Sequence, residues 1–179
     1  MDILAHGLWA GLGVRALARR RPMARRAAAA TVALALLPDL IHMLPVLAWV
    51  LGGGGTAAEL WRYAIALPGQ EPGMPAWVGT AAHHLHCMLH SGLLALCVTA
   101  ALWPWRANLG LPLAGWWSHI LIDVLTHSSD YYASPVLYPL SYEGFDGLAW
   151  NTPWFMVANY LALMGCAFVL RRRGPATAG

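Results

Sequence analysis

The sequence predicts an all-α membrane protein, a polytopic bundle of about five helices. Hydrophobic residues make up 59% of the 179 residues and the mean hydropathy is +0.52, whereas only 11% are charged. This charged share is less than half of that usual in a soluble domain, so the chain could not cover a water-facing surface with polar side chains. The length suits one membrane-embedded domain, predicted over residues 1–173, followed by a disordered tail at 174–179.

Five apolar segments account for the predicted helices. They run over about 2–18, 27–51, 81–103, 109–127 and 153–170. The middle three are long enough to cross a bilayer, which needs roughly 20 residues, while the first and last are close to the lower limit. The first segment could instead lie along the membrane surface. The connections 52–80 and 128–152 contain the Trp and Tyr residues that are frequent at membrane interfaces.

The basic residues predict an orientation. The chain has eleven arginines and no lysine: six lie between Arg15 and Arg26, three are Arg171 to Arg173, and the others are Arg62 and Arg106. If all five segments cross the membrane, every arginine except Arg62 falls on one side. The positive-inside rule then predicts a multi-pass protein of the plasma (inner) membrane, with its N-terminus outside and its C-terminus in the cytoplasm.

The fourth segment contains a metal-ligand pattern, His119-x-x-x-Asp123-x-x-x-His127. Ionisable groups inside a membrane span cost about 2.5–3.5 kcal/mol each on insertion scales, so they need a reason to be there. Spacings of four and eight put the three side chains on one stripe of a helix, where neighbours can share a metal. Asp123, between the two histidines, is the predicted bridge between two ions and, with Asp39, the predicted catalytic residue.

The other histidines gather in the neighbouring segments. The third segment opens with four histidines in eight residues, of which His83, His86 and His90 share one predicted face, although a pH-sensing patch is the alternative. The predicted topology puts these residues, with Asp39, His42 and His6, at a similar depth near the outer leaflet. Asp2 is expected only to cap the first helix. The predicted metal ligands are His6, Asp39, His42, His86, His90, His119, Asp123 and His127.

At these residues the chain resembles the YdjM-like family of inner-membrane metal-dependent hydrolases. One departure from the family is the stretch from His86 to Ser91, which stands where the family has a His-Arg-Gly element before its Thr-His-Ser. The resemblance covers nearly the whole chain. Its matching elements are His6-Gly7, Leu37-Pro38-Asp39, His90-Ser91, the stretch from Gly115 to Asp123, and Tyr138-Pro139-Leu140-Ser141.

A more distant similarity is to zinc-dependent phospholipases C and P1-type nucleases, which are all-helical and have the same order of His, Asp, His and HxxxD. This resemblance implies that Asp39, His90, His119 and Asp123 surround one ion and that His6 and Asp123 help to hold a second. It implies one to three divalent ions, with zinc expected, and a phosphoester of a membrane lipid or lipid-linked molecule as substrate. A nucleic-acid partner is not expected.

Two other functions remain compatible with the sequence. A metal-ion transporter or metal-sensing membrane protein would use the same residues, and a bis-histidine haem protein would use two of the histidines but neither aspartate. The sequence lacks Gly-x-Ser-x-Gly and a glycine-rich phosphate loop with the following Lys, so it supports neither serine hydrolysis nor nucleotide binding. Glu143 and Asp146 could serve as a general acid or a further ligand, although solvated loop residues of this kind are common.

Overall fold

The computed structural model describes residues 1–172, and all its secondary-structure elements over that range are helices, which confirms the predicted all-α class. The tail predicted at 174–179 lies outside the described residues. Helix α1 is followed by a bent pair, α2 and α3. After α4, a second bent pair, α5 and α6, leads into the longest helix, α7. The elements are α1 (Ile3–Ala18), α2 (Arg25–His42), α3 (Leu44–Leu51), α4 (Ala57–Ile65), α5 (Ala76–Leu89), α6 (Gly92–Ala101), the 3-10 turn η1 (Trp103–Trp105), α7 (Arg106–Thr126) and α8 (Pro153–Arg172).

The segment expected as one helix over 27–51 is two helices. Helices α2 and α3 meet at Met43 at an angle of 55°. Pro38 lies inside α2 without ending it, and Pro45 stands in the first turn of α3. Proline has no N–H and its ring collides with the carbonyl four residues before it, so Pro45 stops α2 from continuing but is well placed to begin a new helix. The bend therefore falls after His42, at the site, and not at Pro38.

The segment expected over 81–103 is also broken. Helices α5 and α6 meet at His90 and Ser91 at an angle of 63°. Ser91 caps α6 by accepting a hydrogen bond from the Leu94 amide at 3.0 Å, and its hydroxyl donates to the carbonyl of Tyr138 at 2.7 Å. A serine that caps a new helix and is held by a distant loop explains why the helical pattern in the sequence does not continue in space.

The predicted count of five membrane spans is not confirmed by the helices of residues 1–172. Two helices are long and apolar enough to cross a membrane, Trp103–Thr126 and Pro153–Arg172, and the number rises to four if each bent pair is one span. Helix α1 is apolar but has only 16 residues. Helix α8 exposes Trp154, Val157, Leu161 and Met164 to about the same degree, 57–60%. Such an apolar face is expected against lipid and not against water.

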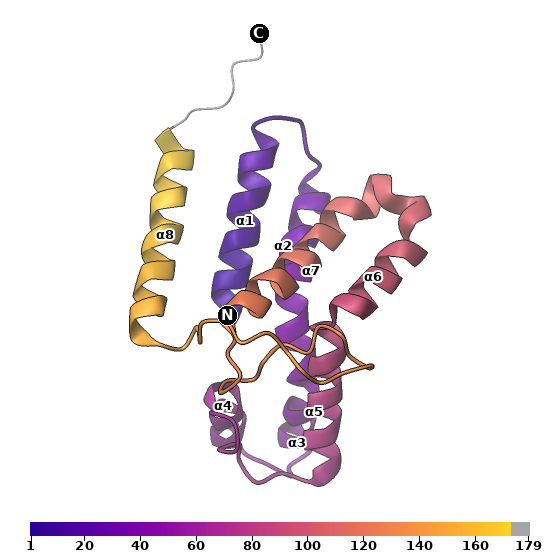
Figure 1. The fold of residues 1–179 in the computed structure, drawn as a ribbon, viewed down its shortest axis with the longest axis vertical. Coiled ribbons are helices and arrows are strands. Elements are labelled where there is room, and N and C mark those ends of the chain that lie inside the picture. The colour runs from indigo at the N-terminus through magenta and orange to yellow at the C-terminus, as the bar shows by residue number, and fades with distance from the viewer. Residues whose placement is uncertain (173–179) are drawn as a thin grey trace.

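Helix α2 stands at the centre of the bundle and packs against α1, α5 and α7 (Figure 1). The crossing with α7 is close, because a Cβ atom on Gly115 would lie 2.0 Å from the carbonyl oxygen of Thr31. Glycine alone permits this approach. One turn further along, the His119 ring on α7 hydrogen-bonds the carbonyl of Ala35 on α2 at 2.8 Å. This crossing brings Asp39 on α2 to the histidine and aspartate of α7.

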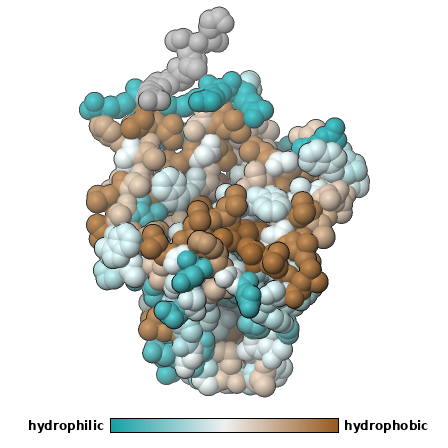
Figure 2. All heavy atoms as spheres, in the orientation of Figure 1, coloured by the Kyte–Doolittle hydropathy of each residue, from teal (hydrophilic) through white to brown (hydrophobic). Residues whose placement is uncertain are grey.

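The two ends of the molecule differ in character. The turn between α1 and α2 lies at the same end as the C-terminal end of α8, while α3, α4 and α5 form the opposite end (Figure 1). Arg19 ties the first end together through a hydrogen bond to the carbonyl of Leu170. Hydrophilic side chains gather there, and brown hydrophobic ones cover much of the middle of the visible face (Figure 2). Arg15–Arg26, Arg171 and Arg172 thus share one end, as the arginine pattern predicts for helices α1, α2 and α8.

Candidate metal centre

Four side chains from three elements converge where α2, α7 and the α5–α6 break meet. They are Asp39, His90, His119 and Asp123, and one ligand atom from each lies within 4.8 Å of all the others. We call this group the central site. His90, His119 and Asp123 are completely buried, and Asp39 retains 9% of its exposure. Two imidazoles and two carboxylates at this separation could hold a divalent metal ion.

The histidine rings are oriented by the backbone. His119 Nδ1 lies 2.8 Å from the carbonyl oxygen of Ala35, and His90 Nδ1 lies 2.8 Å from that of His86. A carbonyl can only accept, so each Nδ1 carries the proton and each Nε2 of the neutral ring presents a lone pair. The two Nε2 atoms lie 3.0 Å apart, and each is 3.2 Å from Oδ2 of Asp123. Backbone carbonyls hold metal-ligating histidines in this way in many proteins.

A second group adjoins the central site through the other oxygen of Asp123. His6 Nε2 lies 2.9 Å from Oδ1 of Asp123, and His127 Nε2 lies 3.6 Å from the same atom. His127 is oriented as His90 and His119 are, with Nδ1 2.8 Å from the carbonyl of Tyr132. We call His6, His127 and Oδ1 of Asp123 the inner site. The two oxygens of Asp123 therefore face different pairs of histidines.

The amino nitrogen of Met1 is a neighbour that the sequence does not predict. It contacts Oδ1 of Asp123 and lies 3.1 Å from Nε2 of His127. Asp2 caps α1 as predicted, since its Oδ1 accepts a hydrogen bond from the Ala5 amide at 3.0 Å. The capped start of α1 brings residue 1 to the inner site, and no side-chain pattern could have indicated it.

The charge of the two carboxylates is not matched by arginine. Within residues 1–172, the ion pairs of Asp39 and Asp123 involve only histidines and the amino group of Met1. The amino group of Met1 supplies one positive charge at Oδ1 of Asp123, whereas the contacts of Asp39 are histidines alone, so a single formal charge faces two buried carboxylates. Burying a carboxylate without its own countercharge is strongly unfavourable. The central site is therefore a place where a bound cation would remove a large electrostatic cost.

The central site opens on the side of Asp39. The Asp39 side chain is 12% exposed, whereas those of His90, His119 and Asp123 are at most 1% exposed. His42 and His86 lie on this side: the rings of these two histidines meet edge to face with centroids 5.3 Å apart, and the His86 ring stacks on His90 at 4.0 Å. All eight predicted ligands thus lie in or beside one cluster.

Two histidines of the third segment lie outside the cluster. His83, predicted to share a face with His86 and His90, is exposed and stacks on Tyr142 with ring centroids 5.9 Å apart. His84 is also exposed, and its Nδ1 lies 3.1 Å from the hydroxyl of Tyr138. The expectation that all three rings share one group is not met for His83: the ring of His86 stacks on His90, whereas the ring of His83, on the same helix, stacks on Tyr142.

The loop from 128 to 152 packs across the end of α7. Backbone bonds from Gly147, Leu148 and Trp150 pair it with the carbonyls of residues 127, 125 and 126 at 2.8–3.0 Å. A Cβ on Gly147 would lie 2.5 Å from the Leu125 carbonyl oxygen, so only glycine fits there. Asp146 accepts bonds from the Ser129 amide and hydroxyl, which lower its pKa, and Glu143 is exposed. Asp146 thus holds the loop, and neither acid contacts the central site.

Tyr132 in this loop and Glu71 in the 52–80 connection form a contact that the sequence does not indicate. The Tyr132 hydroxyl donates to Oε1 of Glu71, while the Tyr132 carbonyl accepts from His127. Partial burial and the hydrogen bond to Glu71 raise the pKa of Tyr132 well above its ordinary value. The contact connects the 52–80 and 128–152 connections to a histidine of the inner site.

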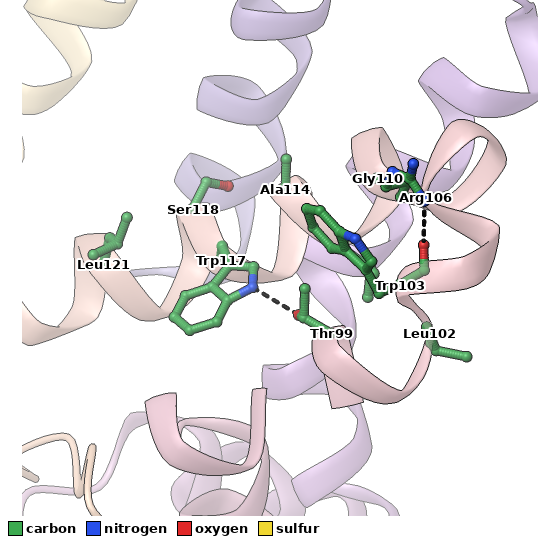
Figure 3. A pocket seen from close by; sticks show the side chains of 10 residues that line it. Thr99, Leu102, Trp103, Arg106, Gly110, Ala114, Trp117, Ser118 and Leu121 are labelled. Atoms are coloured by element: carbon green, nitrogen blue, oxygen red, sulfur yellow. Dashed lines mark hydrogen bonds between the residues drawn. The ribbon is translucent and has the colours of Figure 1, made fainter. Parts of the chain in front are cut away.

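Two cavities lie on the flanks of α7, away from the central site. One, of about 380 Å³, lies between α6, η1 and α7, and Trp117 crosses it to donate a hydrogen bond to Thr99 at 3.0 Å (Figure 3). Another, of about 410 Å³, lies between α1, α2 and α7. Both are lined mainly by apolar side chains, and neither lining includes a histidine or an aspartate. They are grooves in the bundle and do not form the metal centre.

Comparison with protein families, with curated proteins and with solved structures gives no match to this chain. The function of the protein is therefore inferred from the site itself.

Proposed function

We propose that this protein is an integral membrane metal-dependent hydrolase, with zinc as its metal, that cleaves a phosphoester of a lipid or lipid-linked substrate. The observation that carries the proposal is the arrangement of His90 and His119. Their Nε2 lone pairs lie 3.0 Å apart and face two carboxylates, while both Nδ1 atoms are committed to carbonyls. Two imidazole nitrogens and two carboxylate oxygens this close together need a proton or a cation among them, and a divalent ion can meet that need at all four atoms at once.

Asp123 supports a centre with more than one ion. Its Oδ2 atom faces the histidines of the central site and its Oδ1 atom faces those of the inner site. A carboxylate in this position can bridge two ions, which is a common arrangement in phosphoesterases. Zinc bound there would lower the pKa of a water molecule and polarise a phosphoryl oxygen. Asp39 lies at the more exposed side of the central site, and the buried histidines exclude bulk water from the rest of it.

The surroundings favour a membrane substrate. The central site lies at the end of α7 remote from the arginine-rich end, and the apolar faces of the bundle continue beside it. With the arginines in the cytoplasm, the site would lie near the outer leaflet, where lipid phosphates are found. The N-terminus would then be outside and the C-terminus inside.

A bis-histidine haem fits the geometry poorly. The rings of His90 and His119 meet edge to face with centroids 4.8 Å apart, which leaves no space for a porphyrin plane between them. The two aspartates would also have no role in such a protein.

Elemental analysis and a hydrolysis assay of the purified protein test the proposal. We expect at least two zinc ions per chain, hydrolysis of bis(p-nitrophenyl) phosphate or of phospholipid in mixed micelles, and loss of both with EDTA. Asp123→Ala and His119→Ala should lose metal and activity. His83→Ala, an exposed histidine outside the cluster, is the matched control and should keep both. Full metal content in Asp123→Ala would contradict the bridging role, and zinc flux into proteoliposomes without hydrolysis would favour a transporter.

A further inference from the structure

The open side of the central site holds three polar groups that the two proposed ions do not use. They are Oδ2 of Asp39, the ring of His42 and the ring of His86. We propose that a further divalent cation binds among them, with Asp39 as the bridge to the ion of the central site. We call this group the mouth site. The inference rests on the proposed function, because Asp39 belongs to both sites.

The two oxygens of Asp39 have different surroundings. Oδ1 faces the central site, 3.5 Å from Nε2 of His90 and 3.7 Å from Nε2 of His119. Oδ2 is buried and has no hydrogen-bond partner. A buried carboxylate oxygen without a donor is rare in folded proteins and needs an explanation. Within residues 1–172 the ion pairs of Asp39 are with His90 and His119 and involve Oδ1, so neither an arginine nor a histidine accounts for Oδ2.

His42 and His86 show the same lack of partners. Nδ1 of His42 is buried without a hydrogen bond, although His42 is only three residues from Asp39 at the end of α2. The His86 ring makes no hydrogen bond within residues 1–172; its neighbours are the rings of His42, at 5.3 Å, and of His90, at 4.0 Å. This differs from His90, His119 and His127, each of which donates to a carbonyl.

The bend at Met43 creates this arrangement. Helix α2 ends at His42 and the chain changes direction by 55°, and at this end of α2 the ring of His42 meets that of His86 on α5 with centroids 5.3 Å apart. Tyr63 on α4 flanks His42 from the other side, with ring centroids 6.2 Å apart. Two imidazoles and one carboxylate oxygen would supply three ligands to the proposed ion, the number that zinc sites with a water in the fourth position have.

The mouth site would complete a row of three centres joined by two carboxylates. Asp123 would connect the inner and central sites, and Asp39 would connect the central and mouth sites. The ion at the mouth is the one that a phosphate group arriving from outside the bundle would meet first. Two ions about 3.5–4 Å apart can hold the attacking and leaving oxygens of a displacement.

Zinc stoichiometry of a paired variant tests the proposal. His42→Ala combined with His86→Ala should lose one zinc ion per chain after equilibration with Zn²⁺ and desalting, and should keep the others. The matched control is His84→Ala, on the same helix as His86 but exposed and bonded to Tyr138. It should keep the wild-type number. An unchanged zinc number in the paired variant would overturn the mouth site, including where its only defect is a higher KM.

A measurement on the unaltered protein keeps the proposal testable if the paired variant does not fold. Anomalous diffraction at the zinc edge should show a peak between the rings of His42 and His86, separate from the peak of the central site. A central peak without a mouth peak would overturn this inference and leave the proposed function standing. Both peaks without any hydrolysis would support the mouth site and count against the hydrolase. No zinc at all would overturn both.

Discussion

Asp123 and the histidines around it show how single residues share the work of the site. Its two oxygens face two different pairs of histidines, so one substitution should affect both the central and the inner site. Each of the four histidines around it faces only one oxygen of Asp123. Substitution of a histidine that faces one site is therefore expected to remove one ion. Substitution of Asp123 removes the carboxylate that joins the two sites.

His6→Ala should separate the inner site from the central one. The substitution removes a nitrogen 2.9 Å from Oδ1 of Asp123 and leaves the four ligands of the central site in place. We expect one zinc ion fewer per chain by elemental analysis. Loss of all zinc, in a protein that retains its helical circular dichroism, would show that the two sites do not fill independently.

Asp146 gives a pH-dependent prediction outside the membrane-spanning helices. Its hydrogen bonds from the Ser129 amide and hydroxyl lower the pKa of Asp146 from the ordinary value of 3.8. A lowered carboxyl pKa stabilises the folded loop at higher pH, and this contribution is lost as the pH falls through the lowered pKa. The Ser129 amide resonance should therefore titrate with a midpoint below 3.8 by NMR, and the titration should vanish in Asp146→Asn. A midpoint at or above 3.8 would contradict the contact.

At the scale of elements, the crossing of α2 and α7 positions the site. Gly115 permits the close approach to Thr31, and the bond from His119 to the Ala35 carbonyl follows one turn later. Asp39 and the ligands of α7 are therefore brought together by a packing contact between two helices. A change in that contact should move ligands that it does not touch.

Gly115→Ala should destabilise the protein and weaken zinc binding. The added Cβ would lie 2.0 Å from the Thr31 carbonyl oxygen, so the helices must separate. Overpacking of this kind typically costs about 1–3 kcal/mol. Gly110→Ala is the control on the same helix, because its Cβ would meet nothing within 4 Å and alanine raises helix propensity by about 1 kcal/mol. A thermal melt should place Gly115→Ala below wild type and Gly110→Ala at or above it.

At the scale of the whole molecule, the arginine-rich end and the end formed by α3, α4 and α5 are opposite, and the central site lies between them where α2, α7 and the α5–α6 break meet (Figure 1). The turn after α1 and the end of α8 lie together, and the loop from 128 to 152 packs at the other end of α7 (Figure 1). Exposed apolar side chains on α8 and α7 lie between them, as a bilayer requires. This arrangement predicts which positions each side of the membrane can reach.

Cysteine labelling tests the predicted topology. In a background without Cys87, Cys97 and Cys166, Glu143→Cys should react with a membrane-impermeant maleimide added to intact cells. Arg20→Cys should react only after permeabilisation. Both positions are exposed in the structure, so lack of access would reflect the membrane and not the fold. The reverse pattern would place the metal cluster on the cytoplasmic side.

Much of this protein follows from local sequence. The all-helical class follows from hydropathy, because a backbone in lipid must satisfy its own hydrogen bonds. The spacing of His119, Asp123 and His127 gives one stripe on α7 because helical periodicity is a local property. The residue types also limit the chemistry, since buried imidazoles and carboxylates together favour a cation. These statements needed no knowledge of how the helices pack.

The tertiary structure decided which atoms meet. The breaks at Met43 and Ser91 depend on Pro45 and on a loop carbonyl 47 residues from Ser91, so periodicity alone did not show them. The same breaks place His86 beside His42 and leave His83 outside. The contact of Met1 with Asp123 likewise spans the chain and has no signature in side-chain spacing. The ligand types and the helical class are local properties, whereas the pairing of each oxygen with its histidines is set by packing between distant helices.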